Sequence, residues 1–313
     1  MFNLFNQWGA TYMGLQLGSS KEQEQEHIKP SIQKLLDLTE VGILKTFDQI
    51  SIEHNEMIKE QLNKNVYLSE EYQNNDQLFT RKPHLNSSSK YEIHIGGAGG
   101  LAPYLMGVMK VVQDHFHLEL SKSVLIGTSA GSYVAYILAS NTPMDQAYYI
   151  ASHNFIKKMD STYLGKSIHV LSHWEDAFSQ YLTSYHNSKN LKNMDGKLFI
   201  NTQCYLSGSN YIINHFDSHK DLVDATVTSS VIPGVHTSLT VDHHGRRLRD
   251  GWFAKNPYIF PHLKRVEIYI NRWRDFSWYD YLPTGSIEKN DNLYHLGQED
   301  AKRNIDDIRS WFF

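Results

Sequence analysis

The chain has 313 residues, of which 41% are hydrophobic, 12% aromatic and 20% charged, and these are the proportions of a globular protein. They exclude a largely disordered, collagen-like or coiled-coil chain, and the net charge of −4 argues against a dedicated nucleic-acid binder. A single cysteine, Cys204, excludes a disulfide framework and is typical of a reducing compartment.

Residues 1–90 differ from the rest of the chain in composition and residue pattern. After the first 20 residues this segment is polar and charged, with Gly42 as its one glycine. Apolar residues at helical spacing over 28–36 and 43–50 predict two amphipathic helices. The aromatic start lacks the basic segment of a secretory signal, and we expect it to pack on the protein or to lie in a membrane interface.

From residue 91 onward, strand and helix patterns alternate. YEIHI and VLI each predict a strand that is followed by a glycine-containing turn and an apolar helix. KLFINTQCYL and NYIINHF flank Ser-Gly-Ser-Asn and predict a hairpin. This alternation is typical of an α/β sheet domain. The expected strands include 91–95, 124–126 and 266–270, and the expected helices are 101–116, 132–139 and 298–313.

The longest nearly uncharged run, from Ser123 to Ser140, approaches the ~20 residues that a membrane helix needs. A Gly-Thr-Ser-Ala-Gly break in its first half indicates instead a buried strand that turns sharply into a buried helix. The sequence therefore predicts neither a secretory signal nor a membrane span.

Ser129 lies at the centre of this break, in the pattern G-x-S-x-G. Small residues on both sides of a serine permit a tight strand-to-helix turn that projects the hydroxyl. The turn also places the serine at a helix N-terminus, which favours a developing negative charge. The pattern and its context predict a nucleophile.

A second glycine-rich turn, Gly96 to Gly100, follows the strand at 91–95. Its unshielded backbone N–H groups could bind an oxyanion or a phosphate, and G-x-G-x-x-A fits the dinucleotide fingerprint. That fingerprint also needs an acidic residue at the end of the next strand, where this chain has Gly127-Thr128-Ser129. We therefore favour an oxyanion hole for Ser129 over a nucleotide site.

The serine needs a general base, and two candidates follow it in the chain. An α/β-hydrolase triad would use an acid and then a histidine such as His262. Asp250 follows a predicted hairpin, HHGRRLRDG, and a carboxylate on such a turn can take the proton of a serine hydroxyl directly. The residues alone leave both alternatives open.

Taken together, these stretches resemble the motifs of the patatin-like phospholipases. The family's G-G-G-x-[RK]-G loop corresponds to 97–102, and its G-x-S-x-G serine corresponds to Ser129. The aspartate of its D-G-[GA] motif corresponds to Asp250, with Asn256 at a matching spacing beyond it. Residues 225–235 resemble the family's A-x-x-A-S-x-A-x-P segment, which precedes that aspartate. Four motifs in the same order are far more specific than any one of them.

The resemblance covers residues 91–313 and implies a patatin-like three-layer α/β fold, with a central, mostly parallel sheet flanked by helices. It implies a lipid acyl hydrolase of the phospholipase A or lipase type that works through an acyl-enzyme, with Ser129 as nucleophile and Asp250 as base. No cofactor and no metal are implied. The residues expected to form the oxyanion hole are Gly97, Ala98 and Gly99.

The resemblance also implies a phospholipid or neutral acyl lipid as substrate, contact with a membrane surface, and a cytoplasmic, peripherally membrane-associated protein that could need a protein activator. The chain departs from the family at Leu101, Ala102 and Trp252, which replace a basic residue and two glycines. Loss of the basic residue favours a neutral lipid. Residues 1–90 match no region of the family, and we expect them to form a helical, regulatory or membrane-contact region.

Two other functions remain possible, and one pair of residues could bind a metal. The chain could be a Ser-His-Asp carboxylesterase of the α/β-hydrolase type, or a patatin-like module that binds lipid without catalysis. His243 and His244, among 17 histidines, suggest metal binding, but H-E-x-x-H or another ligand spacing is absent.

Overall fold

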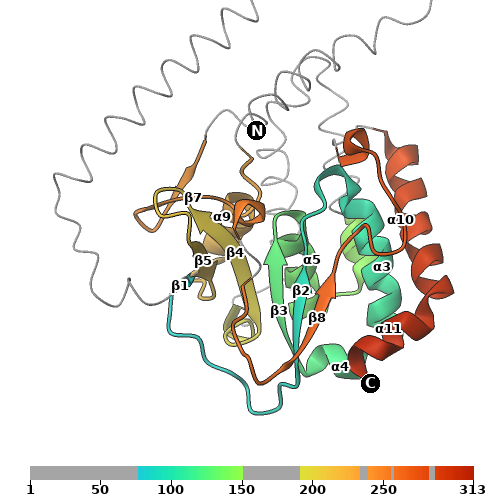
Figure 1. Cartoon of the computed structure of the whole chain (residues 1–313), viewed down its shortest axis with the longest axis horizontal. Coiled ribbons are helices and arrows are strands. Elements are labelled where there is room, and N and C mark those ends of the chain that lie inside the picture. Colours follow the sequence, from blue (N-terminus) through green and yellow to red (C-terminus); the bar gives the residue numbers. More distant parts are fainter. Residues whose placement is uncertain (1–76, 151–190, 233–238, 255–256, 282–285) are drawn as a thin grey trace, which may run out of the picture. The chain divides into compact units, whose positions relative to one another are not determined.

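A computed structural model describes residues 77–150, 191–232, 239–254, 257–281 and 286–313 (Figure 1). Contacts divide the chain into compact units at 1–69 and 70–313, and all described residues belong to the second unit. The helices predicted over 28–36 and 43–50, and the aromatic start, lie outside the described residues. The boundary at residue 90 stays a prediction, although a short strand before it already pairs with the sheet.

The described strands form one mixed sheet in the order β1-β5-β4-β3-β2-β8, and β7 pairs with both β4 and β6. Along this path, four of the five neighbouring pairs are parallel, and only β4 and β5 are antiparallel. The strands are β1 (Gln77–Phe79), β2 (Tyr91–Ile95), β3 (Ser123–Thr128), β4 (Leu198–Cys204), β5 (Asn210–Ile213), β6 (Val241–His243), β7 (Arg246–Asp250) and β8 (Lys264–Ile268). The α/β class with a mostly parallel sheet is therefore confirmed.

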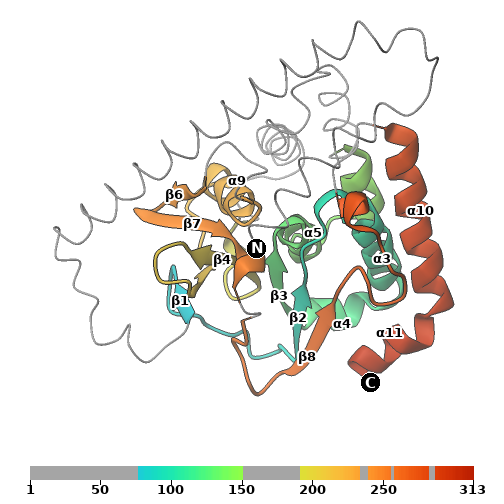
Figure 2. The same cartoon turned by 45° about the horizontal axis from the view of Figure 1, so that its top comes forward.

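Alternating side chains of the strands face two apolar clusters. The larger cluster packs the sheet against α3 (Ala102–His115), α5 (Ala130–Ala139) and α9 (His219–Thr228), which lie on one side of the sheet in Figure 2. α10 (Ile287–Arg303) packs on the outside of α3. A Cβ on Gly107 of α3 or Gly297 of α10 would lie within 2.0 or 2.1 Å of a backbone oxygen of the facing helix, so both positions require glycine.

The smaller cluster covers the opposite face with few side chains. Phe199 and Phe260 meet there edge to face, with ring centroids 5.6 Å apart. Glu92 of β2 lies on this face, fully buried, and its Oε2 accepts the backbone N–H groups of Ile259 and Phe260. The segment that covers this face is thus fixed by a carboxylate as well as by apolar contact. The buried members are Val124, Ile126, Phe199, Ile212, Phe260 and Leu263.

The elements predicted from 91 onward are confirmed, with two differences: β8 lies at Lys264–Ile268, two residues before the expected 266–270, and the C-terminal helix differs. The single helix expected over 298–313 is two helices, α10 and α11 (Ile305–Phe312), separated at Asn304. α10 begins eleven positions earlier than expected because Ser286 caps it, its hydroxyl accepting the N–H of Lys289 at 3.1 Å. The first turns of α10 are mostly polar, so the apolar pattern did not reveal them.

Candidate active site

The two predicted catalytic residues meet because β3 and β7 share one edge of β4. β3 runs parallel to β4 and ends where Thr128 pairs with Asn201. β7 runs antiparallel to β4 and ends where Asp250 pairs with Thr202, the next residue along. The two strands therefore end against each other, and this brings Ser129 and Asp250 together from positions far apart in the chain.

Ser129 occupies the sharp turn between β3 and α5. Its backbone has a φ of 54°, in the left-handed region that L-residues rarely adopt, and its side chain lies at the N-terminus of α5. The flanking glycines permit the turn, since a Cβ on Gly127 would lie 2.4 Å from the Cα of Ser132, and one on Gly131 would lie 2.3 Å from the oxygen of Ile95. The structure therefore has the strand-turn-helix geometry that the G-x-S-x-G pattern predicted.

Asp250 is completely buried, and one of its oxygens is held in place. Oδ1 accepts the backbone N–H of Trp252 at 2.7 Å. Oδ2 has no hydrogen-bond partner among the described residues. Burial raises the pKa of the carboxyl to about 7, and the Trp252 N–H and the nearby Ser129 hydroxyl oppose this shift. Asp250 thus keeps acceptor capacity at Oδ2, and the Ser129 hydroxyl lies close enough to its carboxyl to lower the pKa.

A buried polar network, which sequence reasoning missed, holds both residues. The N–H of Ser129 donates to the hydroxyl of Ser229 at 2.8 Å, and that hydroxyl donates to the backbone oxygen of Asn201 at 2.7 Å. The Asn201 amide group donates to Thr128 at 3.1 Å and to the backbone oxygen of Gly251 at 3.4 Å. Asn201 thereby ties the residue before Ser129 to the residue after Asp250. In the sequence, Asn201 within the apolar strand 198–204 is the local sign of this network.

The glycine-rich loop lies next to Ser129, as the oxyanion-hole prediction requires. A Cβ on Gly97 would lie 3.2 Å from the Cβ of Ser129, so glycine lets the two backbones approach closely. Ala98 is buried, whereas Gly99 is exposed and has a φ of 52°. A Cβ on Gly99 would also lie 2.8 Å from the backbone oxygen of Tyr281. Of the three predicted oxyanion-hole residues, Gly97 therefore lies against Ser129, while Gly99 lies against the backbone of Tyr281.

The structure does not bring a histidine to this pair within the described part of the chain. His262 is exposed and contacts the ring of Phe260, with centroids 6.2 Å apart. His94 is buried on the face of Glu92, and neither of its ring nitrogens has a hydrogen-bond partner in the described ranges. Asn256, whose spacing from Asp250 matches the family motif, lies outside the described residues, as does His236.

Fold and site together define an α/β protein with a buried serine and carboxylate at the ends of two strands. No protein-family model matches the chain. It is 26% identical over 171 residues to the human 1-acylglycerol-3-phosphate O-acyltransferase PNPLA3, a match that covers 54% of this chain and 35% of that protein. It is 26% identical over 170 residues to the human patatin-like phospholipase domain-containing protein 2, covering 53% of this chain and 33% of that protein.

The resemblance to patatin-like phospholipases, first indicated by the motifs, is thus confirmed at low identity. The matches span only about a third of the length of these curated relatives. Among solved structures, VipD from Legionella pneumophila has a TM-score of 0.39 and 10% identity, covering 58% of this chain and 50% of that chain. The ExoU–SpcU complex of Pseudomonas aeruginosa has a TM-score of 0.36 and 13% identity, and the match covers 71% of this chain and 52% of that chain.

The raised pKa of Asp250 predicts how stability responds to Asp250→Asn. Between about pH 4 and pH 7 the folded protein keeps a proton that the unfolded chain has lost, so the stability of the wild type falls as pH rises. Asparagine does not ionise, so the stability of the variant lacks this dependence on pH. We expect the difference in Tm, variant minus wild type, to increase from pH 4 to pH 8 in calorimetry. The exposed Asp275→Asn is the control, and a difference that is flat for Asp250→Asn would contradict a buried carboxyl of raised pKa.

Proposed function

We propose that this protein is a lipid acyl hydrolase that cleaves fatty-acyl esters with Ser129 as nucleophile and Asp250 as general base. The observation that carries the proposal is the meeting of a strained serine turn with a buried carboxylate that has one unused oxygen. The neighbouring glycine loop and the patatin-like relatives support it.

In the proposed reaction, Oδ2 of Asp250 takes the proton of the Ser129 hydroxyl as its oxygen attacks the ester carbonyl. The N–H groups of Gly97, Ala98 and Gly99, with the N-terminus of α5, stabilise the oxyanion. Collapse of the tetrahedral intermediate expels the lipid alcohol, which takes the proton from Asp250, and leaves an acyl-enzyme. Asp250 then takes a proton from the water that attacks this ester, and it returns that proton to the Ser129 oxygen as the fatty acid leaves. A pKa near 7 suits a group that both accepts and returns a proton.

The proposed substrate is a phospholipid or a neutral acyl lipid. Leu101, which replaces the basic residue of the family loop, is fully buried and offers no positive charge to a phosphate, so a neutral lipid is favoured. The first relative is named as an acyltransferase, and the same acyl-enzyme would serve transfer to a lipid hydroxyl in place of water. The two alternatives are a triad esterase and a lipid-binding module without catalysis, and the experiments below distinguish each of them from the proposed hydrolase.

We propose that exposed aromatic side chains near the site contact a lipid surface. Trp252 is 70% exposed, two positions after Asp250. Tyr269 and Tyr281 are partly exposed and border Gly96 and Gly99 of the glycine loop. Aromatic rings are favoured at the level of lipid headgroups.

We further propose that residues 1–90 contact a membrane or regulate the enzyme, that the protein is cytoplasmic and peripherally bound to membranes, and that it uses a protein activator. None of the described helices has the length and hydropathy of a membrane span.

Labelling with a fluorophosphonate tests the nucleophile. We expect the wild-type chain to be labelled and Ser129→Ala to resist labelling, with turnover of a nitrophenyl ester reduced at least about a thousandfold. Ser121→Ala, which removes an exposed hydroxyl remote from the turn, should label normally. Near-normal turnover by a folded Ser129→Ala would refute the proposed nucleophile, and a wild type without labelling or turnover would favour the idle module.

The base is tested by comparing Asp250→Asn with His262→Ala. Asparagine keeps the size of the side chain and removes its basic oxygen, so turnover should fall ~10²–10⁴-fold and no acyl-enzyme burst should remain. His262→Ala should stay within about twofold of the wild type, because that ring is exposed. The kcat/KM of the wild type should rise with pH through about 7 as Asp250 ionises. If the histidine variant matches the loss at Asp250, the protein is a triad esterase.

Lipid contact is tested with Trp252→Ala on two substrates. Because a large aromatic side chain contributes ~1.5–3 kcal/mol when it leaves water, hydrolysis of lipid in vesicles should fall roughly tenfold. Hydrolysis of a soluble ester should be nearly unchanged. Leu118→Ala is the matched control, since Leu118 is 57% exposed and lies on α4 (His117–Ser121), at the opposite end of β3 from Ser129. Equal losses on both substrates would show that Trp252 acts on the site rather than on the lipid surface.

A further inference from the structure

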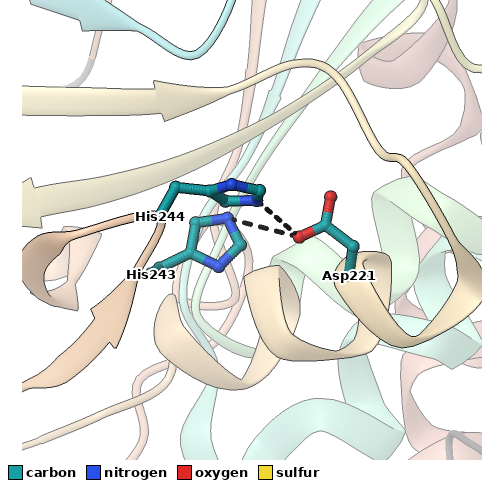
Figure 3. Close-up of side chains that lie close together, drawn as sticks. All are labelled: Asp221, His243 and His244. Atoms are coloured by element: carbon teal, nitrogen blue, oxygen red, sulfur yellow. Dashed lines mark hydrogen bonds and ion pairs between the residues drawn. The ribbon is translucent and has the colours of Figure 1, made fainter.

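Outside the proposed active site, two histidines and a carboxylate converge between α9 and the β6–β7 hairpin (Figure 3). His243 ends β6, and His244 with Gly245 forms the two-residue turn to β7. Both turn residues have positive φ, 51° and 75°, as in a type I′ hairpin turn. Asp221 lies in the first turn of α9. Among the described residues this is the one group of its kind, with ligand atoms within 4.8 Å of one another.

The distances suit a transition-metal ion. Nε2 of His244 lies 2.8 Å from Oδ1 of Asp221, and Nε2 of His243 lies 3.8 Å from the same oxygen. Donors around a tetrahedral Zn²⁺, with bonds of ~2.0–2.1 Å, are separated by ~3.4 Å. Small side-chain rotations would therefore place all three donors around one ion. Figure 3 shows both rings directed at the same carboxylate oxygen.

His243 provides a second, independent observation. Its side chain is only 3% exposed, and Nε2 has no hydrogen-bond partner among the residues that the structure describes, because 3.8 Å to Asp221 is too long for a hydrogen bond. A buried polar atom without a partner is costly and rare. The ion pair between His244 and Asp221 explains the position of His244, but it leaves this nitrogen of His243 unexplained.

The surroundings of Asp221 fit a ligand whose orientation is fixed. Its Oδ2 accepts the N–H of Asp217 at 3.1 Å, so Oδ1 is the oxygen that faces the rings. Asp224 and Asp242 add negative charge that attracts a cation at His243. Outer groups that hold a ligand in this way commonly raise metal affinity 10–100-fold.

We propose that Asp221, His243 and His244 bind one Zn²⁺ ion, with water completing the coordination. Two imidazoles and a carboxylate favour zinc over Ca²⁺ or Mg²⁺, which prefer oxygen ligands. Each ring would coordinate through Nε2, so its remaining proton lies on Nδ1. His244 is 43% exposed, which gives the ion a path from solvent.

Such an ion would be structural, because it joins the two elements that lead to the proposed active site. α9 begins beside the cluster and ends before Ser229, whose hydroxyl holds the N–H of Ser129. β7 begins at the hairpin turn and ends at Asp250. Zinc would therefore fix the far ends of both elements, about 15 Å away by the length of a ten-residue helix.

Equilibrium dialysis of the untagged full-length chain against ZnCl₂, with metal analysis, tests the site. We expect one tightly bound Zn²⁺ per chain, and affinity at least about tenfold lower in His244→Asn and Asp221→Asn. Asparagine keeps the left-handed backbone that His244 adopts, so this exposed variant should fold even if changes at Asp221 or His243 do not. His262→Ala, at an exposed histidine outside the cluster, is the control and should bind as the wild type does.

Co²⁺ as a probe should give visible absorption that zinc abolishes and that His244→Asn lacks. Two results would overturn the proposal: no saturable zinc binding by the wild type, or unchanged affinity in His244→Asn. Preference for Mg²⁺ or Ca²⁺ over Zn²⁺ would also overturn it. None of these readouts depends on ester hydrolysis, so the proposed function can fail without affecting the outcome.

Discussion

The edge of β4 that β3 and β7 share fixes the position of Ser129 and Asp250. β3 occupies this edge as far as Asn201, and β7 occupies it from Thr202 onward in the opposite direction. Side chains alternate along a strand, so a slip of one residue in the β7 register would turn Asp250 to the other face of the sheet. The apolar side chain of Leu248, buried two positions before Asp250 in the larger cluster, opposes such a slip. The packing of the core and the meeting of the two polar residues therefore depend on the same register.

Holding these residues together has a cost that the surrounding network offsets. A non-glycine residue with positive φ costs on the order of 1–3 kcal/mol, and Asp250 has lost its water entirely. Ser229 and Asn201 hold the backbone on both sides of the pair through buried hydrogen bonds. They leave Oδ2 of Asp250 without a partner among the described residues. The hydrogen-bonding capacity withheld from Oδ2 is what a proposed base needs, because an oxygen already occupied by an N–H is a weaker proton acceptor.

Local patterns predicted much of the sheet but not the contacts between distant segments. β2, β3 and the helices after them follow from residue periodicity and glycine turns, which are properties of a few neighbouring residues. The start of α10 was missed because its first turns are mostly polar, and because the close contact of α10 with α3 at Gly107 and Gly297 carries no apolar side chain that would mark it in the sequence. Ser229 was missed as a partner of Ser129 because the two are 100 positions apart. The histidine pair gives only a weak metal signal in the sequence for the same reason, since Asp221 is 23 positions from His244 and the spacing matches no known motif.

α9 and the β6–β7 hairpin connect the two clusters of polar residues described above. A helix transmits position along its length because its backbone hydrogen bonds fix each residue relative to the next turn, and a paired strand does so through its ladder. Asp221 and Ser229 therefore stand at the two ends of one rigid element, and His243 and Asp250 stand at the two ends of another. The hydrogen bond from Ser129 to Ser229 joins the end of α9 to the turn after β3, and the pairing of Asp250 with Thr202 joins the end of β7 to β4. At the other end, Nε2 of His244 lies 2.8 Å and Nε2 of His243 lies 3.8 Å from the Asp221 carboxylate. Whatever strengthens that junction also stabilises the relative position of Ser129 and Asp250.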